Sequence, residues 1–133
     1  MSNHRKPPAA NTYRIRYLRS PQWFGRRDRW FAHERRLRGI VRCALCLSEG
    51  NENTLELHHL DYLGVTQTPS GWAAREPHDD LTALHPRCHE WVHKLIDRDR
   101  ALSGLLSRRT ASVQAITRLR SRIVQTLTDR EDL

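Results

Sequence analysis

The sequence lacks the features that mark several common classes of protein. No run among its 133 residues is both apolar and long enough to cross a bilayer, so we expect no membrane partner. Residues 1–11 are polar and show no apolar core of a secretory signal, which favours a cytoplasmic protein. No segment repeats another, which excludes a repeat architecture. A chain of this length normally forms one domain.

Cysteine is also scarce, and its odd number is informative. The chain has 3 cysteines, which argues against a disulfide framework. A C-x-x-C pair in a chain without a secretory signal is better interpreted as a metal site in a reducing compartment. A chain this short buries a modest core, so a bound metal would add useful stability.

Positive charge exceeds negative charge and is unevenly distributed along the chain. The net charge is +8. Residues 1–42 carry a net +10, residues 43–93 a net −6 and residues 94–133 a net +4. Basic flanks around an acidic centre favour a polyanionic partner such as nucleic acid. The alternative is a solvated charged surface, since arginine-rich helices are common.

The pattern of apolar residues predicts an α+β fold. We expect a disordered tail over 1–12, a folded domain over 13–103 and a C-terminal helix within 104–133. Helical spacing and short alternating runs predict, in order, a helix over 21–38, a strand over 54–60, a loop over 64–77 anchored by Trp72, a strand over 81–84, a helix from about 87 to 102 and a helix over about 110–128.

The first helix has clear start and stop signals. Ser20 is the expected N-cap, Pro21 takes the first helical position and Gly39 is the expected C-cap. Its apolar residues should face inward and its arginines outward. The expected inward residues are Trp23, Trp30, Phe31 and Leu37.

The first metal pattern is a pair of two-residue spacings. Cys43 and Cys46 form C-x-x-C, and His85 and Cys88 repeat the spacing further along the chain. Two such pairs commonly close a tetrahedral zinc site, because each tight turn presents two ligands. Three thiolates and one imidazole suit Zn²⁺, so we expect a structural zinc here. The alternative is that these residues are small buried hydrophobes and a surface histidine.

The second metal pattern consists of histidines. His89 and His93 are four residues apart, so both rings project from one helix face. His58, on the predicted strand, supplies a third nitrogen, and three ligands leave open positions as a catalytic metal needs. His59 points to the other strand face, where it can act as a base oriented by Asp79 or Asp80. A single histidine here would be better interpreted as a polar residue of the strand. Four histidines at these spacings, beside a C-x-x-C pair, favour a metal site.

One competing motif overlaps this pattern. Residues 89–93 match H-E-x-x-H, the helix motif of zinc-dependent proteases, with Glu90 as its base. No histidine follows His93 to complete that site. The motif also leaves the pair His58 and His59 and the basic flanks unexplained, so we disfavour protease chemistry.

Taken together, these residues resemble the HNH endonucleases of the ββα-metal (His-Me finger) fold, and among them the subset with a zinc-knuckle pair around the catalytic motif. The resemblance covers roughly residues 13–95. The matching segments are 17–23, Cys43-x-x-Cys46, 57–62 and 80–93. It implies a small ββα-metal core with a structural zinc knuckle, flanked by an N-terminal basic helix and a C-terminal amphipathic helix.

The resemblance also implies residue roles. His59 matches the general base, and Asp80 stands where the family often has an asparagine that fixes the ring of the base. The catalytic divalent cation would be held by His58, His89 and His93, and the structural Zn²⁺ by Cys43, Cys46, His85 and Cys88. Two positions depart from the pattern: an aspartate replaces the asparagine, and His85 replaces a cysteine.

The implied activity is hydrolysis of DNA phosphodiester bonds, with one Mg²⁺, Mn²⁺, Ni²⁺ or Zn²⁺ ion stabilising the leaving group. Double-stranded DNA is the expected partner, its backbone positioned by Arg26, Arg27 and Arg29. The sequence leaves open RNA as the substrate, and a non-catalytic zinc-stabilised nucleic-acid-binding module. The C-terminal helix forms either a homodimer face or part of the core. If the chain is phage-encoded, the cytoplasm in question is that of the host.

Overall fold

The computed structural model describes the backbone of residues 8–131 and the side chains of residues 12–131. The fold is α+β, as the sequence predicted. The helices are α1 (Pro8–Leu18), α2 (Pro21–Arg38), α3 (Pro86–Arg98) and α4 (Arg108–Glu131), with a 3-10 turn η1 (His78–Asp80) and a π-helical turn η2 (Ala101–Leu105). The strands are β1 (Val41–Arg42), β2 (Glu49–Gly50), β3 (Glu56–His59), β4 (Val65–Thr68), β5 (Gly71–Ala74) and β6 (Leu81–Leu84).

Helix α2 begins and ends where its capping residues predicted. The hydroxyl of Ser20 accepts a hydrogen bond from the amide of Trp23 at 3.2 Å. Gly39 ends the helix with a φ of 81°, a backbone conformation that glycine adopts without steric cost. Three of the four expected inward residues, Trp23, Trp30 and Phe31, are buried, but Leu37 is 58% exposed. Leu37 lies in the last turn of α2, beyond the part of the helix that packs on the core.

The strands form three two-stranded antiparallel sheets, of which β3–β6 is the one that places the site. His58 pairs with Thr82 and His59 with Leu81 across this sheet. Because side chains alternate along a strand, His58 and His59 project to opposite faces. Helix α3 follows β6 directly and packs against both strands.

The structure differs from the sequence-based expectation at the hairpin, at the start of the chain and at the end of α3, which stops at Arg98 before η2 and not near residue 102. Residues expected to form a loop contain the β4–β5 hairpin, whose turn uses Gly71 at a φ of 119°. Trp72 anchors this hairpin as expected, with ring-centroid distances of 4.6 Å to Tyr13 and 5.4 Å to Tyr17. Helix α1 begins at Pro8, inside the expected tail, and residues 1–7 of that tail lie outside the described residues. Proline suits the first helical turn, where its missing amide would have no partner.

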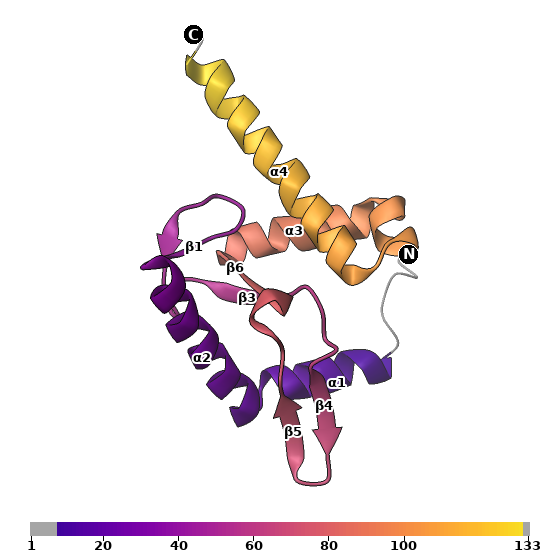
Figure 1. The fold of residues 1–133 in the computed structure, drawn as a ribbon. Helices are drawn as coiled ribbons and strands as arrows, with labels where there is room; N and C mark the ends of the chain where they lie inside the picture. The colour runs from indigo at the N-terminus through magenta and orange to yellow at the C-terminus, as the bar shows by residue number, and fades with distance from the viewer. Residues whose placement is uncertain (1–7, 132–133) are drawn as a thin grey trace.

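In Figure 1, β3 and β6 lie between α1 and α2 on one side and α3 on the other. The first half of α4 packs across α3, and its second half extends away from the body. All buried residues of α4 lie in that first half: Ala111, Ser112, Ala115 and Ile116. No helix within residues 8–131 has the length and apolar character needed to span a membrane.

Candidate metal centre

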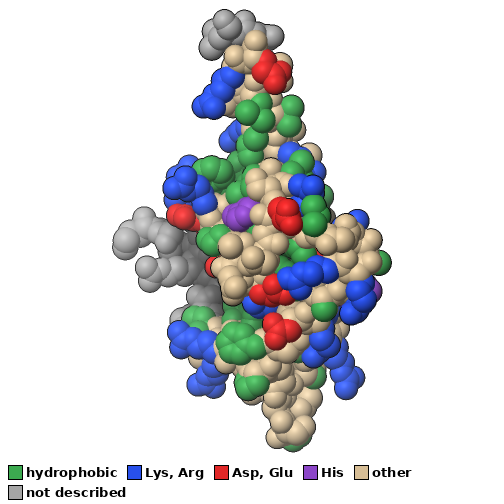
Figure 2. Space-filling view, turned by 90° about the vertical axis from the view of Figure 1, so that its left-hand side faces the viewer, with side chains coloured by type: hydrophobic (Ala, Val, Ile, Leu, Met, Phe, Trp, Pro, Cys, Tyr) green, Lys and Arg blue, Asp and Glu red, His purple; other side chains and the backbone are tan. Residues whose placement is uncertain are grey.

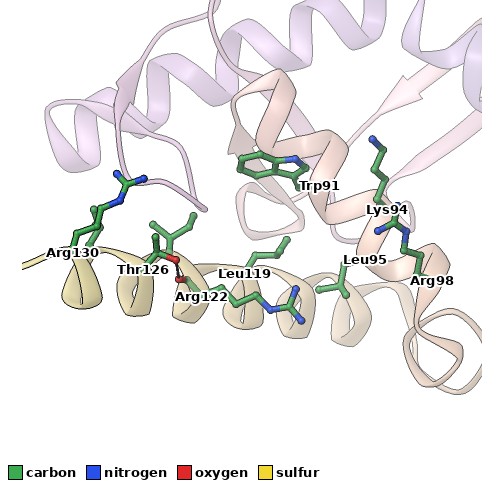
Figure 3. A pocket seen from close by; sticks show the side chains of 10 residues that line it. Trp91, Lys94, Leu95, Arg98, Leu119, Arg122, Thr126 and Arg130 are labelled. Atoms are coloured by element: carbon green, nitrogen blue, oxygen red, sulfur yellow. Dashed lines mark hydrogen bonds between the residues drawn. The ribbon is translucent and has the colours of Figure 1, made fainter. Parts of the chain in front are cut away.

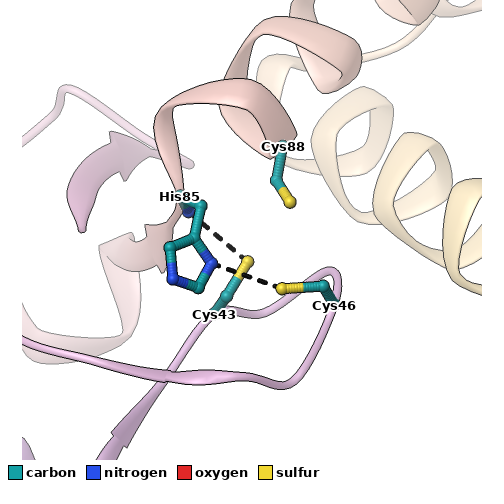
Figure 4. A group of neighbouring side chains, drawn as sticks. All are labelled: Cys43, Cys46, His85 and Cys88. Atoms are coloured by element: carbon teal, nitrogen blue, oxygen red, sulfur yellow. Dashed lines mark hydrogen bonds between the residues drawn. The ribbon is translucent and has the colours of Figure 1, made fainter. Parts of the chain in front are cut away.

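The C-x-x-C segment forms a tight turn between β1 and β2. The amide of Cys43 donates to the carbonyl of Ser48 at 2.9 Å, and the amide of Leu47 donates back to Cys43 at 3.0 Å. Leu47 has a φ of 65°, which non-glycine residues adopt uncommonly. This turn brings the thiols of Cys43 and Cys46 to the same side of the chain (Figure 4).

The start of α3 supplies the other half of the group. His85 is the N-cap of α3, Pro86 takes its first position and Cys88 follows in its first turn. Ligand atoms of all four predicted residues lie within 4.8 Å of one another, so this Cys₃His group can hold a structural zinc. Burial and the neighbouring thiols raise the pKa of Cys88, so the loss of its proton requires a nearby cation.

Backbone amides stabilise negative charge on the knuckle sulfurs. The amides of Leu45 and His85 each donate to Sγ of Cys43 at 3.4 Å. Burial alone would raise the pKa of Cys46, but hydrogen bonds involving Ser48, Cys43 and His85 lower it to about 6. This environment favours the thiolate of Cys46, which is the form that binds zinc.

A second group forms where β3 meets α3. Nε2 of His89 lies 3.1 Å from Nδ1 of His58 and 3.1 Å from Nε2 of His93. Ligand atoms of all three fall within 4.8 Å of one another, and no carboxylate belongs to the group. Nitrogen lone pairs this close repel unless a proton or a cation lies between them. The donor set therefore fits a divalent metal with open coordination positions.

Burial keeps the imidazoles of His58 and His93 in the neutral form, which binds metal. Burial, reinforced by the positive charge of Arg108, lowers the pKa of His58 to about 2. Burial and the neighbouring His89 lower the pKa of His93 to about 4. Both rings are therefore neutral near physiological pH, and each has a nitrogen lone pair to offer.

Two residues contact the outward nitrogens of this group. Nε2 of His58 lies 2.8 Å from Oγ of Ser112, which is fully buried in α4. Nδ1 of His89 lies 3.1 Å from Oε1 of Glu56 on β3. The Glu56 carboxylate can only accept, and the Ser112 hydroxyl can also accept; in that arrangement each outward nitrogen carries the proton and the inward nitrogen is free for a metal. The C-terminal helix is thus part of the site, which the sequence did not indicate.

His59 lies on the opposite face of β3 in an aromatic environment and is 2% exposed. Its ring stacks on Tyr62 at a centroid distance of 4.1 Å and lies 4.7 Å from the ring of Trp23. Its Nε2 is 2.7 Å from Oε2 of Glu76, and the same oxygen accepts a hydrogen bond from the hydroxyl of Tyr17 at 2.6 Å. Burial lowers the pKa of His59, whereas Glu76 opposes that change.

Glu76, and not Asp79 or Asp80 as the sequence suggested, is the carboxylate that contacts the ring of His59. The Asp80 carboxylate pairs instead with the guanidinium of Arg109, and the carbonyl of Asp79 accepts a hydrogen bond from the same side chain. Asp80 therefore lies near the site without orienting the His59 ring, because η1 directs it toward α4. Glu76 is 2% exposed, and its pKa is lowered because the hydrogen bonds from His59 and Tyr17 outweigh the effect of burial.

The contact with Glu76 also determines which nitrogen of the His59 ring carries the proton. An ionised carboxylate can only accept a hydrogen bond, so Nε2 of His59 carries the proton and Nδ1 carries the lone pair. Oε1 of Glu76 has no hydrogen-bond partner among the described residues. Sequence reasoning missed Glu76 because it lies after the hairpin, 17 residues from His59, and only the fold brings it close.

His59 and the three-histidine group line one cavity of about 220 Å³. Two cations line it as well, Arg14 from α1 and Arg108 from α4. Their guanidinium carbons lie 4.6 Å and 4.9 Å from the ring centroid of Tyr62, and Nε of Arg108 donates to the carbonyl of His59 at 2.7 Å. The cavity thus combines three histidines that can hold a metal, a fourth buried imidazole and two cations.

The three arginines predicted to contact nucleic acid have different surroundings. Arg27 donates to the carbonyls of Glu52 and Leu55, so its guanidinium is used within the fold. Nε of Arg26 donates to the carbonyl of Glu76 at 2.9 Å. Arg29 is exposed and lines a shallow cavity of about 340 Å³ on α2. That cavity is bounded by Arg26, Arg29, Ala32, His33, Arg36 and His78.

No protein-family model, curated protein or solved structure matches this chain.

Proposed function

We propose that the chain is a metal-dependent endonuclease of the HNH type that hydrolyses phosphodiester bonds in DNA. The observation that carries the proposal is the meeting of His58, His89 and His93 at one point, with His59 lining the same cavity. The order strand, strand, helix in β3, β6 and α3 supports the ββα-metal core that the family resemblance implies.

The metal would be held by His58, His89 and His93 through the nitrogens that face one another. When bound, a divalent cation there supplies Lewis-acid stabilisation of the charge that develops on the phosphoryl and leaving oxygens. Ser112 and Glu56 hold the outward protons of His58 and His89, so these rings are oriented before any ion arrives.

His59 would act as the general base. Its Nδ1 takes a proton from water as the water oxygen attacks phosphorus, and the bond from phosphorus to the 3′ oxygen breaks. The leaving 3′ oxygen takes a proton from solvent, giving the 5′-phosphate and 3′-hydroxyl products of the HNH family. Glu76 accepts the Nε2 proton of the same ring and stabilises the imidazolium that forms, as the carboxylate does in a Ser-His-Asp triad. Tyr17 holds Glu76 in place through its hydroxyl.

Positive charge at the cavity supports a phosphate substrate. Arg14 and Arg108 flank Tyr62 at the cavity wall, and two guanidinium groups suit the oxygens of a phosphodiester. Further out, Arg29 and Arg36 on α2 would contact the DNA backbone without reading its sequence. We infer duplex DNA as the substrate from this combination.

The test is incubation of supercoiled plasmid with the protein and Mg²⁺, Mn²⁺, Ni²⁺ or Zn²⁺. Wild type should nick or linearise the plasmid with at least one ion, and His59→Ala should lower the rate by about 10²- to 10⁴-fold. Thr66→Ala, in the exposed part of β4, is the matched control and should cleave like wild type. The His59→Ala protein should keep the wild-type metal content and a cooperative unfolding transition, at a lower melting temperature because the change removes a buried ring and the partner of Glu76.

The alternatives give different outcomes in the same assay. Plasmid that stays intact with every ion, while the protein still binds a DNA duplex, would favour the non-catalytic zinc-stabilised module. Cleavage of an RNA transcript with intact plasmid would favour a ribonuclease on the same fold. A His59→Ala protein that cleaves like wild type would remove His59 from the mechanism.

A further inference from the structure

Helices α3 and α4 form an apolar groove on the side of α3 away from His89 and His93. We define the α3–α4 groove as the cavity of about 530 Å³ lined by Trp91, Lys94, Leu95, Arg98, Leu119, Arg122, Ile123, Thr126, Leu127 and Arg130 (Figure 3). Leu95, Leu119 and Ile123 form its half-buried floor. Trp91 is 43% exposed and Leu127 is 53% exposed at its edges. We propose that this groove docks an acidic amphipathic helix of a partner protein.

The exposed apolar surface follows from the length of α4. This helix has 24 residues, but its buried residues end at Ile116. The apolar spacing continues through Leu119 and Ile123, which pack partly against the core, to Leu127, which is exposed. Figure 2 shows hydrophobic side chains running up this protruding part of α4, with Lys and Arg side chains beside them. A groove between two helices accommodates a third helix through an apolar face with residues at i, i+3, i+4 and i+7.

The positive charge around the groove indicates that its partner is acidic. Its rim carries four cations, Lys94, Arg98, Arg122 and Arg130, and its lining contains no acidic side chain. Lys94 pairs with Glu90 at 2.9 Å, whereas no ion pair among the described residues involves the other three. Glutamates on either side of the apolar stripe of a docked helix would complement these cations.

The same charge argues against two other occupants. In a second copy, α4 would bring 6 arginines against 2 acids within residues 108–131, so like charges would face each other. This disfavours the homodimer that the sequence left open.

Duplex DNA is also a poor occupant of the groove. It offers phosphates to the rim but no apolar side chains to cover Trp91 and Leu127. Trp91 lies midway between His89 and His93 in the sequence, so its side chain projects from the other side of α3. Docking is therefore separate from the proposed hydrolysis.

The experiment uses the full chain and a pair of labelled synthetic peptides of about 18 residues. The first has leucines at helical spacing with glutamates elsewhere, and the second has lysine in place of every glutamate. Fluorescence polarisation should give the acidic peptide a dissociation constant below about 100 µM, and the basic peptide at least about tenfold weaker binding. Trp91→Ala and Arg122→Glu should each weaken the acidic peptide by about tenfold or more. Arg36→Glu, an exposed arginine on α2, is the matched control and should leave its affinity unchanged.

Other results would overturn the proposal. Equal affinity for the two peptides, no binding of the acidic one, or an unchanged affinity in Arg122→Glu would each do so. A dimer in analytical ultracentrifugation that Leu127→Glu dissociates would assign the groove to a second copy. Displacement of the acidic peptide by a short DNA duplex, in a manner that Arg122→Glu weakens, would assign it to nucleic acid. Plasmid cleavage by Arg122→Glu should match wild type, which separates this test from that of the proposed function.

Discussion

Single side chains decide which nitrogen of each histidine carries its proton, and therefore what that histidine can do. The Ser112 hydroxyl faces the outward nitrogen of His58, and the Glu76 carboxylate faces the outward nitrogen of His59. Under the proposed function, these contacts prepare His58 to bind a metal and His59 to accept a proton. Neighbouring residues in one strand thus acquire different chemistry from partners on different elements.

Replacing Ser112 with alanine should weaken metal binding at the three-histidine group by about 10- to 100-fold. Without that acceptor, the His58 ring can carry its proton on Nδ1, the nitrogen that faces His89. Isothermal titration with Mn²⁺ or Ni²⁺ measures the change, and the zinc content of the knuckle should stay the same. Ser121→Ala is the matched control, because the Ser121 hydroxyl is exposed and bonds only to its own helix at Thr117. Equal affinity in wild type and Ser112→Ala would contradict this role.

The buried histidines should make the free energy of unfolding fall as the pH falls. Burial lowers the pKa of His93 from 6.5 to about 4 in the folded chain. Between these values the unfolded chain binds more protons, so acid favours unfolding. His93→Gln removes this group, and the slope of unfolding free energy against pH should become shallower by up to about 1.4 kcal/mol per pH unit. Urea unfolding of zinc-loaded protein, from neutral pH down to the middle of this window, measures the slope. Identical slopes for the two proteins would refute the assignment.

Among the elements, the zinc knuckle ties the two halves of the chain together. It joins the β1–β2 turn to the start of α3, and the guanidinium of Arg120 in α4 donates to the carbonyl of Ala44 in the same turn. The turn therefore contacts both C-terminal helices. With zinc bound to this group, a domain of this size would depend on the metal for stability.

Cys43→Ser should prevent stable folding, and not only lower the rate of catalysis. Structural zinc contributes on the order of 10 kcal/mol of folding free energy in small zinc modules. We expect loss of bound zinc and of the cooperative thermal transition, followed by metal analysis and circular dichroism. Chelation of the zinc in the wild-type protein should reproduce the same loss. A Cys43→Ser protein that melts like wild type would show that the knuckle is not a structural zinc site.

Two arginines of α2 should have different roles: Arg27 stabilises the fold, and Arg29 contacts DNA. Arg27→Ala leaves the carbonyls of Glu52 and Leu55 without their donor and should destabilise the chain by about 1–3 kcal/mol. Arg29→Glu should leave stability nearly unchanged but weaken duplex binding and reduce its salt dependence. Denaturant unfolding and duplex binding at two salt concentrations measure the two effects. If both variants changed the same property, this division of roles would be wrong.

Local signals explain which elements the sequence could predict. Helix α2 has a serine N-cap, a proline and a glycine C-cap, and its predicted bounds were confirmed. Helix α1 was missed because Tyr17 is its one buried side chain among those described, so no apolar stripe marks it. The β4–β5 hairpin was missed because only Val65 of its first strand is buried, and no alternation of apolar residues reveals the strand.

At the scale of the whole molecule, the basic flanks and the acidic centre partly neutralise each other. Arg35 of α2 pairs with Glu52, and Arg109 of α4 pairs with Asp80. The uneven charge of the sequence therefore holds the chain together as well as favouring a polyanion. Cations without such partners line the histidine cavity, the α2 surface and the α3–α4 groove.

Some residues of the candidate site could be predicted from their spacing in the sequence, whereas others could be found only from the fold. Both metal groups were predictable because most ligands come in pairs within one turn or one helix, such as His89 and His93. Glu76, Ser112 and Arg108 were not, because each reaches the histidines from a distant part of the chain. The spacing of ligands in a sequence carries no information about these tertiary contacts.

The most direct test of the central claim is a crystal of the chain grown with Mn²⁺ and a short DNA duplex, with anomalous scattering measured at the manganese edge. The account predicts one manganese peak bounded by Nδ1 of His58, Nε2 of His89 and Nε2 of His93, with a phosphate oxygen also within bonding distance. A duplex bound elsewhere with no manganese among these three rings would contradict it.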